Sequence, residues 1–130
     1  LRVGYAVASK EVADLLNRVR QPFNVNNLAI AAARAALDDH LFIAESFELN
    51  RRGMEQIVAG LKRLGLEHIP SHGNFVTFAV ADGAAVNQKL LRQGVIVRPI
   101  GGYGLPNHLR VTIGRETENV RFLEALEQSL

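Results

Sequence analysis

Two arginines carry the strongest chemical signal in the sequence, because each stands in a short run of branched apolar residues. Arg98 ends the run Val95–Arg98 and Arg110 lies within Leu109–Ile113, and both runs are typical of strands. Since side chains alternate between the two faces of a strand, Arg110 shares a face with Thr112. Two guanidiniums on paired strands form a planar, permanently charged clamp for a carboxylate or a phosphate. The sequence therefore predicts a site for an anionic small molecule.

The loop between these strands, Pro99–His108, contains three glycines around Tyr103. Glycine allows a backbone to approach a ligand closely. The loop lacks the GKS or GKT sequence and the strand–loop–helix order of a P-loop. It can be a flexible hairpin loop or a loop that contacts a ligand, and its place between two arginine-bearing strands favours the second interpretation.

The remaining polar residues predict neither a metal site nor a complete catalytic centre. There is no cysteine, which excludes thiolate chemistry and disulfide bonds. The four histidines lack the spacing of metal ligands. The three lysines lie in polar stretches of expected helices, without the apolar surroundings that would activate an amine for Schiff-base chemistry. These lysines are Lys10, Lys62 and Lys89.

Periodicity predicts an α+β fold, with a small, mostly antiparallel sheet covered by helices and preceded by a helical N-terminal segment. We expect the sheet to use residues of about 73–80, 95–98 and 108–113, with a short edge strand near 68–70. A separate strand, outside this sheet, is expected at Leu1–Ala8. Helices are expected from the N-cap Ser9 up to Pro22, over 28–37 after a cap at Asn26 or Asn27, over 41–64, between Gly83 and Gly94, and from about Glu116.

The composition does not indicate a particular class of binding partner. The chain has 130 residues, 48% hydrophobic and 22% charged, with a net charge of +2, which is ordinary for one globular domain. This charge does not call for nucleic acid or a membrane surface, and no apolar run is long enough to span a membrane. The lack of cysteine fits a reducing cytoplasm.

The whole chain, Leu1 to Leu130, resembles the C-terminal third of the histidinol-phosphate aminotransferases. The resemblance rests on LRVGY at the start, GVIVRPIGGYG in the middle, and LRVTIG followed by an acidic helix start. LRVGY is common to many related aminotransferases, whereas VIVRP, a loop and LRVTIG are more specific. This branch also includes a threonine-phosphate decarboxylase and some aromatic aminotransferases, which stay open as alternatives.

The resemblance implies part of a pyridoxal-phosphate enzyme of the aspartate-aminotransferase fold (fold type I). The parent enzyme would be a cytoplasmic homodimer of histidine biosynthesis, with no nucleic-acid or membrane partner. It would convert histidinol phosphate and 2-oxoglutarate into imidazole acetol phosphate and glutamate.

Residue by residue, the resemblance implies three binding roles. Arg2 matches the arginine that binds the cofactor phosphate, and Arg110 matches the arginine that binds the substrate carboxylate of glutamate. Arg98 matches a second arginine that helps to hold the anionic end of the substrate. No catalytic residue falls in this chain, because the family's Schiff-base lysine lies upstream of Leu1.

The resemblance also implies a division of the chain. Residues 1–24 would be the incomplete end of the large cofactor domain, 25–65 connecting helices, and 66–130 the small C-terminal domain. As the chain opens in mid-strand, we expect a fragment that is inactive alone and does not hold pyridoxal phosphate. Without its sheet neighbours, the stretch 1–8 is expected to fray, rearrange or pair with another copy.

Two other classes of protein compete with this interpretation. A regulatory module that binds small molecules can have the same strand–helix–strand–strand–helix order. The mid-strand start and Arg2, which has no use without a phosphate, argue against it. A basic nucleic-acid binder ranks last, because the arginines are scattered and only eight aromatic residues occur.

Overall fold

A computed structural model describes residues 2–130, and its contacts divide the chain into two compact units, Leu1–Ile43 and Ala44–Leu130. The helices are α1 (Lys10–Val19), α2 (Asn27–Asp38), α3 (His40–Arg63), α4 (Gly83–Arg92) and α5 (Glu116–Glu127). The strands are β1 (His68–Ile69), β2 (Phe75–Ala79), β3 (Arg98–Pro99) and β4 (His108–Thr112), and a 3-10 turn, η1 (Gly101–Tyr103), follows β3. The helices and the α+β class that the sequence predicts are therefore confirmed. None of the helices within 2–130 combines the length and hydropathy needed to cross a membrane.

The first unit contains α1, α2 and the start of α3, and its helices begin at the capping residues that the sequence indicates. Ser9 Oγ accepts a hydrogen bond from the Val12 amide at 3.4 Å, and Asn26 Oδ1 accepts one from the Ala29 amide at 2.8 Å. Helix α1 has a strong apolar stripe but buries no residue. The sequence therefore defines these helices locally, while their apolar side chains stay largely exposed within this unit.

The strand predicted at Leu1–Ala8 is wrong for the described residues 2–8, and Leu1 lies outside the described residues. Residues 2–8 form no strand and are exposed. A strand is stabilised by the hydrogen bonds of its neighbours, and the described part of this unit contains no other strand. In addition, Arg2 has a left-handed backbone with φ of 46°, which an extended strand does not adopt.

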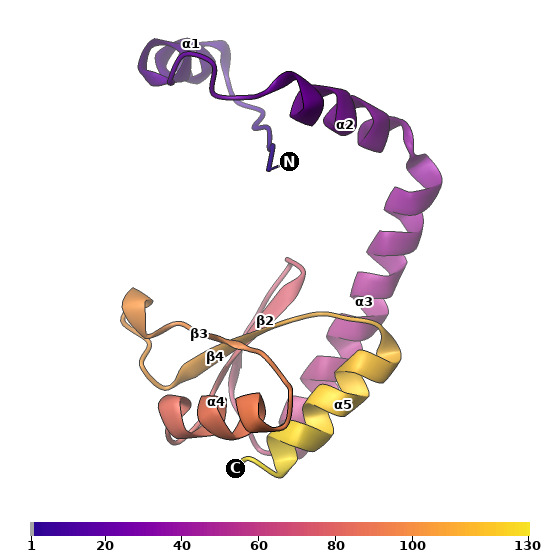
Figure 1. Ribbon diagram of the computed structural model, residues 1–130, viewed down its shortest axis with the longest axis vertical. Coiled ribbons are helices and arrows are strands. Elements are labelled where there is room, and N and C mark those ends of the chain that lie inside the picture. Colours follow the sequence, from indigo (N-terminus) through magenta and orange to yellow (C-terminus); the bar gives the residue numbers. More distant parts are fainter. Residues whose placement is uncertain (1) are drawn as a thin grey trace. The chain divides into compact units, whose positions relative to one another are not determined.

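The second unit is built on a four-stranded antiparallel sheet in the order β1–β2–β4–β3 (Figure 1). The central strands β2 and β4 pair over their full length, from Phe75 opposite Thr112 to Ala79 opposite His108. Strand β1 lies at one edge, as the sequence predicts, and β3 lies at the other. This order places β4 between β2 and β3, so its side chains meet neighbours on both sides.

Helices α3, α4 and α5 cover one face of this sheet. Two cross-strand pairs point toward them, Val76 with Val111 and Phe78 with Leu109, and all four side chains are buried. The rings of Phe78 and Phe122 meet edge to face, with centroids 5.8 Å apart. The helices also contribute Ile57, Leu61, Val86, Leu90, Leu123 and Leu126 to the same core. Since strand side chains alternate, the opposite face carries the remaining residues of these strands, among them Phe75, Thr77 and Arg110.

The strand predicted at Val95–Arg98 is shorter and begins later, because β3 covers Arg98–Pro99. Gly94 has φ of 73°, and the Val95 amide donates a hydrogen bond to the Leu90 carbonyl at 3.0 Å. Val95 thus completes the C-terminal cap of α4 and cannot pair in the sheet at the same time.

A close backbone contact fixes α4 beside the segment that leads into β4. A Cβ atom on Gly83 would lie 2.7 Å from the Pro106 carbonyl oxygen and 3.2 Å from Asn107 Cα. The Asn107 carbonyl also accepts a hydrogen bond from the Val80 amide at 2.9 Å. Both crowded atoms belong to a backbone that is held in place, so only glycine fits at this position.

Gly83→Ala is therefore expected to lower the free energy of unfolding by about 1–3 kcal/mol, the usual effect of overpacking. The matched control is Gly102→Ala, where an added Cβ meets no atom within 4 Å. Urea denaturation followed by circular dichroism measures both variants. Equal stability of the Gly83→Ala variant and the unmodified chain would contradict the close contact.

Candidate functional site

The two arginines singled out by the sequence are direct cross-strand partners. Arg98 of β3 lies opposite Arg110 of β4 in the antiparallel register. Directly opposite residues project from the same face of a sheet, with Cβ atoms about 4.5–5.5 Å apart. Because Leu109 and Val111 of β4 point into the core, Arg110 and Arg98 lie on the face away from the helices.

The same register extends into a row across all four strands. It runs through Arg98, Arg110, Thr77 and Ile69. The two ends of the row, Arg98 and Ile69, are exposed, whereas Arg110 is half-buried and Thr77 is buried. One arginine is thus enclosed by the centre of the sheet, and the other stands at its edge.

Arg110 also lies on an aromatic ring. Its guanidinium carbon is 4.6 Å from the centroid of the Phe75 ring on β2. Phe75 pairs with Thr112, so it is a diagonal neighbour of Arg110 on the same face. A guanidinium over an aromatic face at this distance is a cation–π contact. Sequence reasoning missed this contact, although an aromatic residue at the start of β2 was a possible signal once the register is known.

Neither Arg98 nor Arg110 forms an ion pair within residues 2–130. Like charges directly opposite each other destabilise an antiparallel sheet. The pair is therefore a local cost to the fold, and an anion bound to both guanidiniums would offset it. This arrangement is chemically suited to hold a carboxylate or a phosphate.

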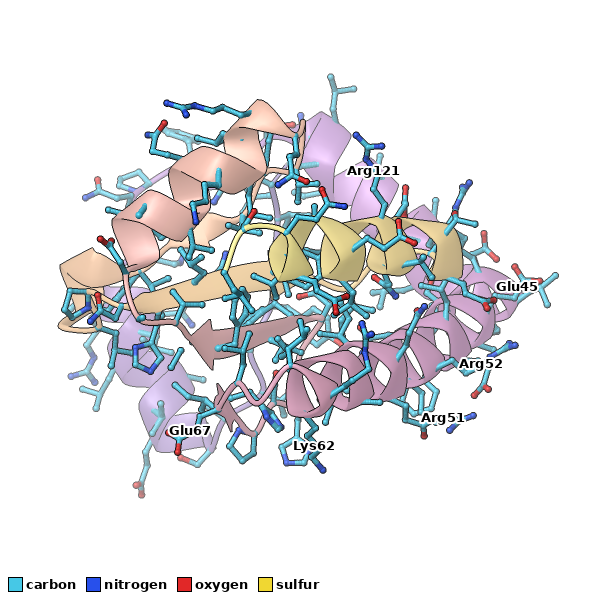
Figure 2. The ribbon with its side chains drawn as sticks, turned by 90° about the horizontal axis from the view of Figure 1, so that it is seen from below. Glu45, Arg51, Arg52, Lys62, Glu67 and Arg121 are labelled. Carbon is cyan, nitrogen blue, oxygen red and sulfur yellow. The ribbon has the colours of Figure 1, made fainter. Side chains whose placement is uncertain are left out.

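Arginines on α3 provide a contrast (Figure 2). Arg51 binds Glu48 at 2.8 Å and Glu55 at 2.6 Å, and Arg52 binds Glu48 at 3.1 Å. The hydrogen bonds that Arg51 donates lower the pKa of the Glu48 carboxyl below its ordinary value. These cations are already neutralised by carboxylates of their own helix, so they are not available to a ligand in the same way.

The third predicted site residue, Arg2, belongs to the first unit, whereas Arg98 and Arg110 belong to the second. Arg2 is exposed and forms no ion pair within the described residues. The structure thus brings two of the three predicted arginines together, and the roles of all three stay predictions.

The glycine-rich loop contains the short turn η1, and Gly104 ends it with φ of 79°. Tyr103 is exposed in this turn. His108, which follows the loop, shares the arginine face of β4, and its buried Nδ1 has no hydrogen-bond partner within 2–130. Part of the loop is therefore a regular 3-10 turn.

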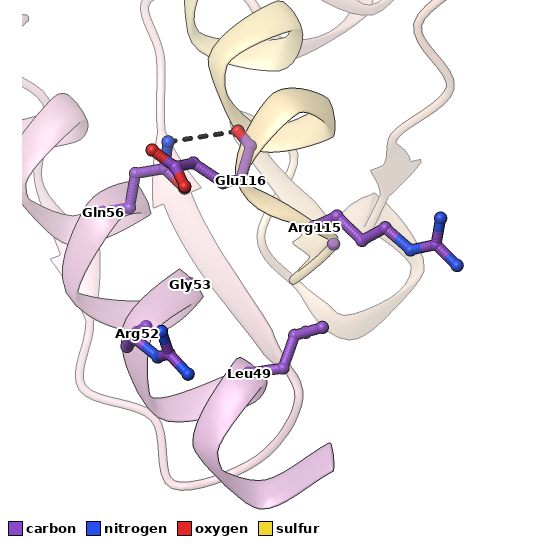
Figure 3. A pocket seen from close by; sticks show the side chains of 7 residues that line it. Leu49, Arg52, Gly53, Gln56, Arg115 and Glu116 are labelled. Carbon is purple, nitrogen blue, oxygen red and sulfur yellow. Dashed lines mark hydrogen bonds between the residues drawn. The ribbon is translucent and has the colours of Figure 1, made fainter. Parts of the chain in front are cut away.

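A cavity of about 440 Å³ lies between α3 and the start of α5 (Figure 3). Its lining includes Leu49, Arg52 and Gln56 of α3, and Arg115 before α5. The Gln56 side-chain amide donates a hydrogen bond to the Glu116 carbonyl at 3.2 Å across it. Neither Arg98 nor Arg110 lines this cavity, so it is a different place from the arginine face.

Asn119 is buried beside this cavity and holds the end of β4 in position. Its Oδ1 accepts a hydrogen bond from the Gly114 amide at 2.9 Å, and its Nδ2 donates to the Gly114 carbonyl at 3.1 Å and to Gln56 Oε1 at 2.9 Å. One amide thus ties the segment after β4 to α3 and α5. Sequence reasoning missed Asn119, because its signal is only a polar residue on the apolar side of α5.

Comparison with known proteins identifies the family. The sequence model of the family described as "Aminotransferase class I and II" matches residues 1–126. The chain therefore belongs to this aminotransferase family, as the sequence motifs predict. The shared fold places a small antiparallel sheet under helices, as described above for the second unit.

The relatives agree with one another. The chain is 82% identical over 130 residues to histidinol-phosphate aminotransferase 1 of Dechloromonas aromatica, and 61% identical to the histidinol-phosphate aminotransferase of Methylobacillus flagellatus. Both matches cover 100% of this chain, and 36% and 35% of those proteins. The chain thus spans about a third of the length of the curated relatives it matches.

Solved structures give the same fold. The histidinol-phosphate aminotransferase of Clostridium acetobutylicum matches with a TM-score of 0.78 and 27% identity, over 92% of this chain and 37% of that one. The aspartate aminotransferase of Thermus thermophilus, solved with maleate, matches with a TM-score of 0.62 and 26% identity, over 69% of this chain and 25% of that one.

The Asn119 network gives a prediction with a control of opposite sign. Asn119→Leu leaves the half-buried Gly114 amide and carbonyl without their side-chain partner and is expected to destabilise the chain by about 1–3 kcal/mol. Asn87→Leu is the control, because the buried Oδ1 of Asn87 has no hydrogen-bond partner in the described part of the chain. Its replacement is expected to be neutral or stabilising in chemical denaturation. Similar losses in both variants would contradict the network.

Proposed function

We propose that this chain is part of a pyridoxal-phosphate-dependent histidinol-phosphate aminotransferase, in which it binds the acidic groups of the substrates. The parent enzyme would transfer the amino group of histidinol phosphate to 2-oxoglutarate, giving imidazole acetol phosphate and glutamate. One observation carries this proposal: Arg98 and Arg110 lie opposite each other on one face without carboxylate partners in the described residues. The high identity to proteins of this name supports the choice of substrate.

In this proposal Arg110 binds the carboxylate of glutamate and 2-oxoglutarate, and Arg98 helps to hold the anionic end of the substrate. Arg110 sits on a central strand and is half-buried, so its fork of N–H donors has a defined position. Arg98 sits on an edge strand and is exposed, so it can reach groups of different length. A cation with a defined position, such as Arg110, orients the amine relative to the cofactor and replaces water around the anion.

The residues present fit one part of the cofactor. Arg2 is an exposed guanidinium without an ion pair within 2–130, which suits a phosphate group. When bound, pyridoxal phosphate supplies the electron sink that allows an amino group to leave one carbon and join another. Two of the lysines are engaged elsewhere, since Lys10 pairs with Asp14 at 2.9 Å and Lys89 donates to the Ser129 carbonyl at 2.9 Å.

We further propose how the chain is divided within the parent enzyme. Residues 1–24 would complete the cofactor domain, 25–65 would connect the domains, and 66–130 would form the small domain. The parent enzyme would be a cytoplasmic homodimer. The exposed apolar stripe of α1 supports this division, because α1 buries no residue within the first unit and would pack on the cofactor domain.

Replacing either arginine in the full-length enzyme tests the proposed clamp. Arg110→Ala and Arg98→Ala are each expected to lower kcat/KM for the acidic substrates by roughly 10- to 10²-fold, the effect of losing a charge-assisted bond in the transition state. Steady-state kinetics with histidinol phosphate and 2-oxoglutarate measures this loss. The matched control is Arg63→Ala, an exposed arginine that pairs with Glu127 at 3.3 Å. Unchanged kinetics in both site variants would reject the clamp.

The chain alone is expected neither to hold pyridoxal phosphate nor to transaminate. Lys10 and Lys89 are engaged by Asp14 and by the Ser129 carbonyl, and Lys62 is exposed, so none of the three has the apolar surroundings that would activate an amine toward the cofactor. The measurement is an absorbance titration with pyridoxal phosphate, followed by gel filtration and an activity assay, with the full-length enzyme as the positive control. A persistent cofactor band together with turnover by the isolated chain would contradict the expectation.

A further inference from the structure

We propose that Phe75 is a positioning residue for substrate binding, because its ring holds the Arg110 guanidinium in the orientation that receives the acid group. This inference rests on the proposed function of Arg110. The guanidinium carbon lies 4.6 Å from the ring centroid, well within the range of a cation–π contact. No other arginine of the described residues makes such a contact with a ring.

The ring itself is held by the backbone around it. Phe75 pairs with Thr112 on β4, and the Asn74 carbonyl before it accepts a hydrogen bond from the Ile113 amide at 2.9 Å. A Cβ added to Gly73 would lie 3.5 Å from the ring, so the turn before β2 packs against it. Asn50 of α3 fixes that turn by donating a hydrogen bond to the Gly73 carbonyl at 3.1 Å.

The contact with Phe75 offsets the repulsion that Arg110 experiences from Arg98. Arg98 directly opposite repels Arg110, and no carboxylate within 2–130 balances the two charges. The negative face of an aromatic ring attracts a cation without neutralising it. Phe75 therefore fixes the position of Arg110 and leaves its charge and its N–H donors available to an acid. A positioned donor loses less side-chain entropy on binding than a mobile one.

Arg98 has no such support, since it is exposed on the edge strand and has no ring contact in the described residues. The side chain of Arg110 is thus held more firmly than the side chain of Arg98. A change at Phe75 should act on the affinity for an acid that Arg110 binds, and it should leave the chemical step nearly unchanged.

The test uses the full-length enzyme, with maleate and succinate as dicarboxylate probes. Phe75→Leu removes the ring and is expected to raise the Kd of the probe, and the KM for 2-oxoglutarate, by roughly 2- to 30-fold, with kcat within about twofold. Phe75→Tyr keeps the ring and is expected to restore both values to within about twofold. Phe122→Leu is the matched control, because it makes the same change in the core on the other face of the sheet. It should lower Tm without separating KM from kcat.

The outcomes separate this inference from the proposed function. A raised Kd in Phe75→Leu that Phe75→Tyr restores supports the positioning role. An unchanged Kd in Phe75→Leu, or a loss of kcat at unchanged Kd, overturns it. If Arg110→Ala also leaves the Kd unchanged, the proposed function fails; if Arg110→Ala raises it, only the role of Phe75 fails. Should Phe75→Leu not fold, Phe75→Met, which keeps the volume without the ring, takes its place.

Discussion

The antiparallel register of β4 with its two neighbours is the constraint on which the site depends. A shift of one residue would turn Arg110 into the core and Leu109 out of it. The buried pairs of β2 and β4 hold the register from one face, because their apolar side chains are removed from water only in this alignment. The position of Arg110 opposite Arg98 on the other face is therefore a consequence of core packing.

The surrounding contacts keep that register from both ends of β4. Gly83 allows α4 to approach the segment before the strand, and the Asn119 amide binds the segment after it. The stability gained in the core offsets the repulsion between two guanidiniums that have no ion-pair partner in residues 2–130. In this pair Arg110 is half-buried on a central strand and Arg98 is exposed on an edge strand, and proteins commonly give up local stability at positions that serve binding.

Much of this arrangement follows from the sequence. Capping residues such as Ser9 and Asn26, and the alternation of Leu109, Arg110 and Val111, depend on local geometry, so the helices, the sheet class and the arginine face could be predicted. The sequence alone could not show whether residues 2–8 form a strand, because a strand needs a neighbouring strand to pair with. The late start of β3 followed from a helix cap that competes for Val95. The contacts of Phe75 and Asn119 depend on residues far apart in the chain, which no local pattern shows.

In the proposed function, Arg98 and Arg110 together bind the acidic groups of the substrates. The most direct measurement is an NMR titration of this chain with succinate, following the side-chain Nε–Hε resonances of its arginines. We expect saturable shifts of the Arg98 and Arg110 resonances with a common Kd, while Arg63, already paired with Glu127, shifts little. No shift at the two site arginines, or equal unsaturable shifts at all exposed arginines, would contradict it.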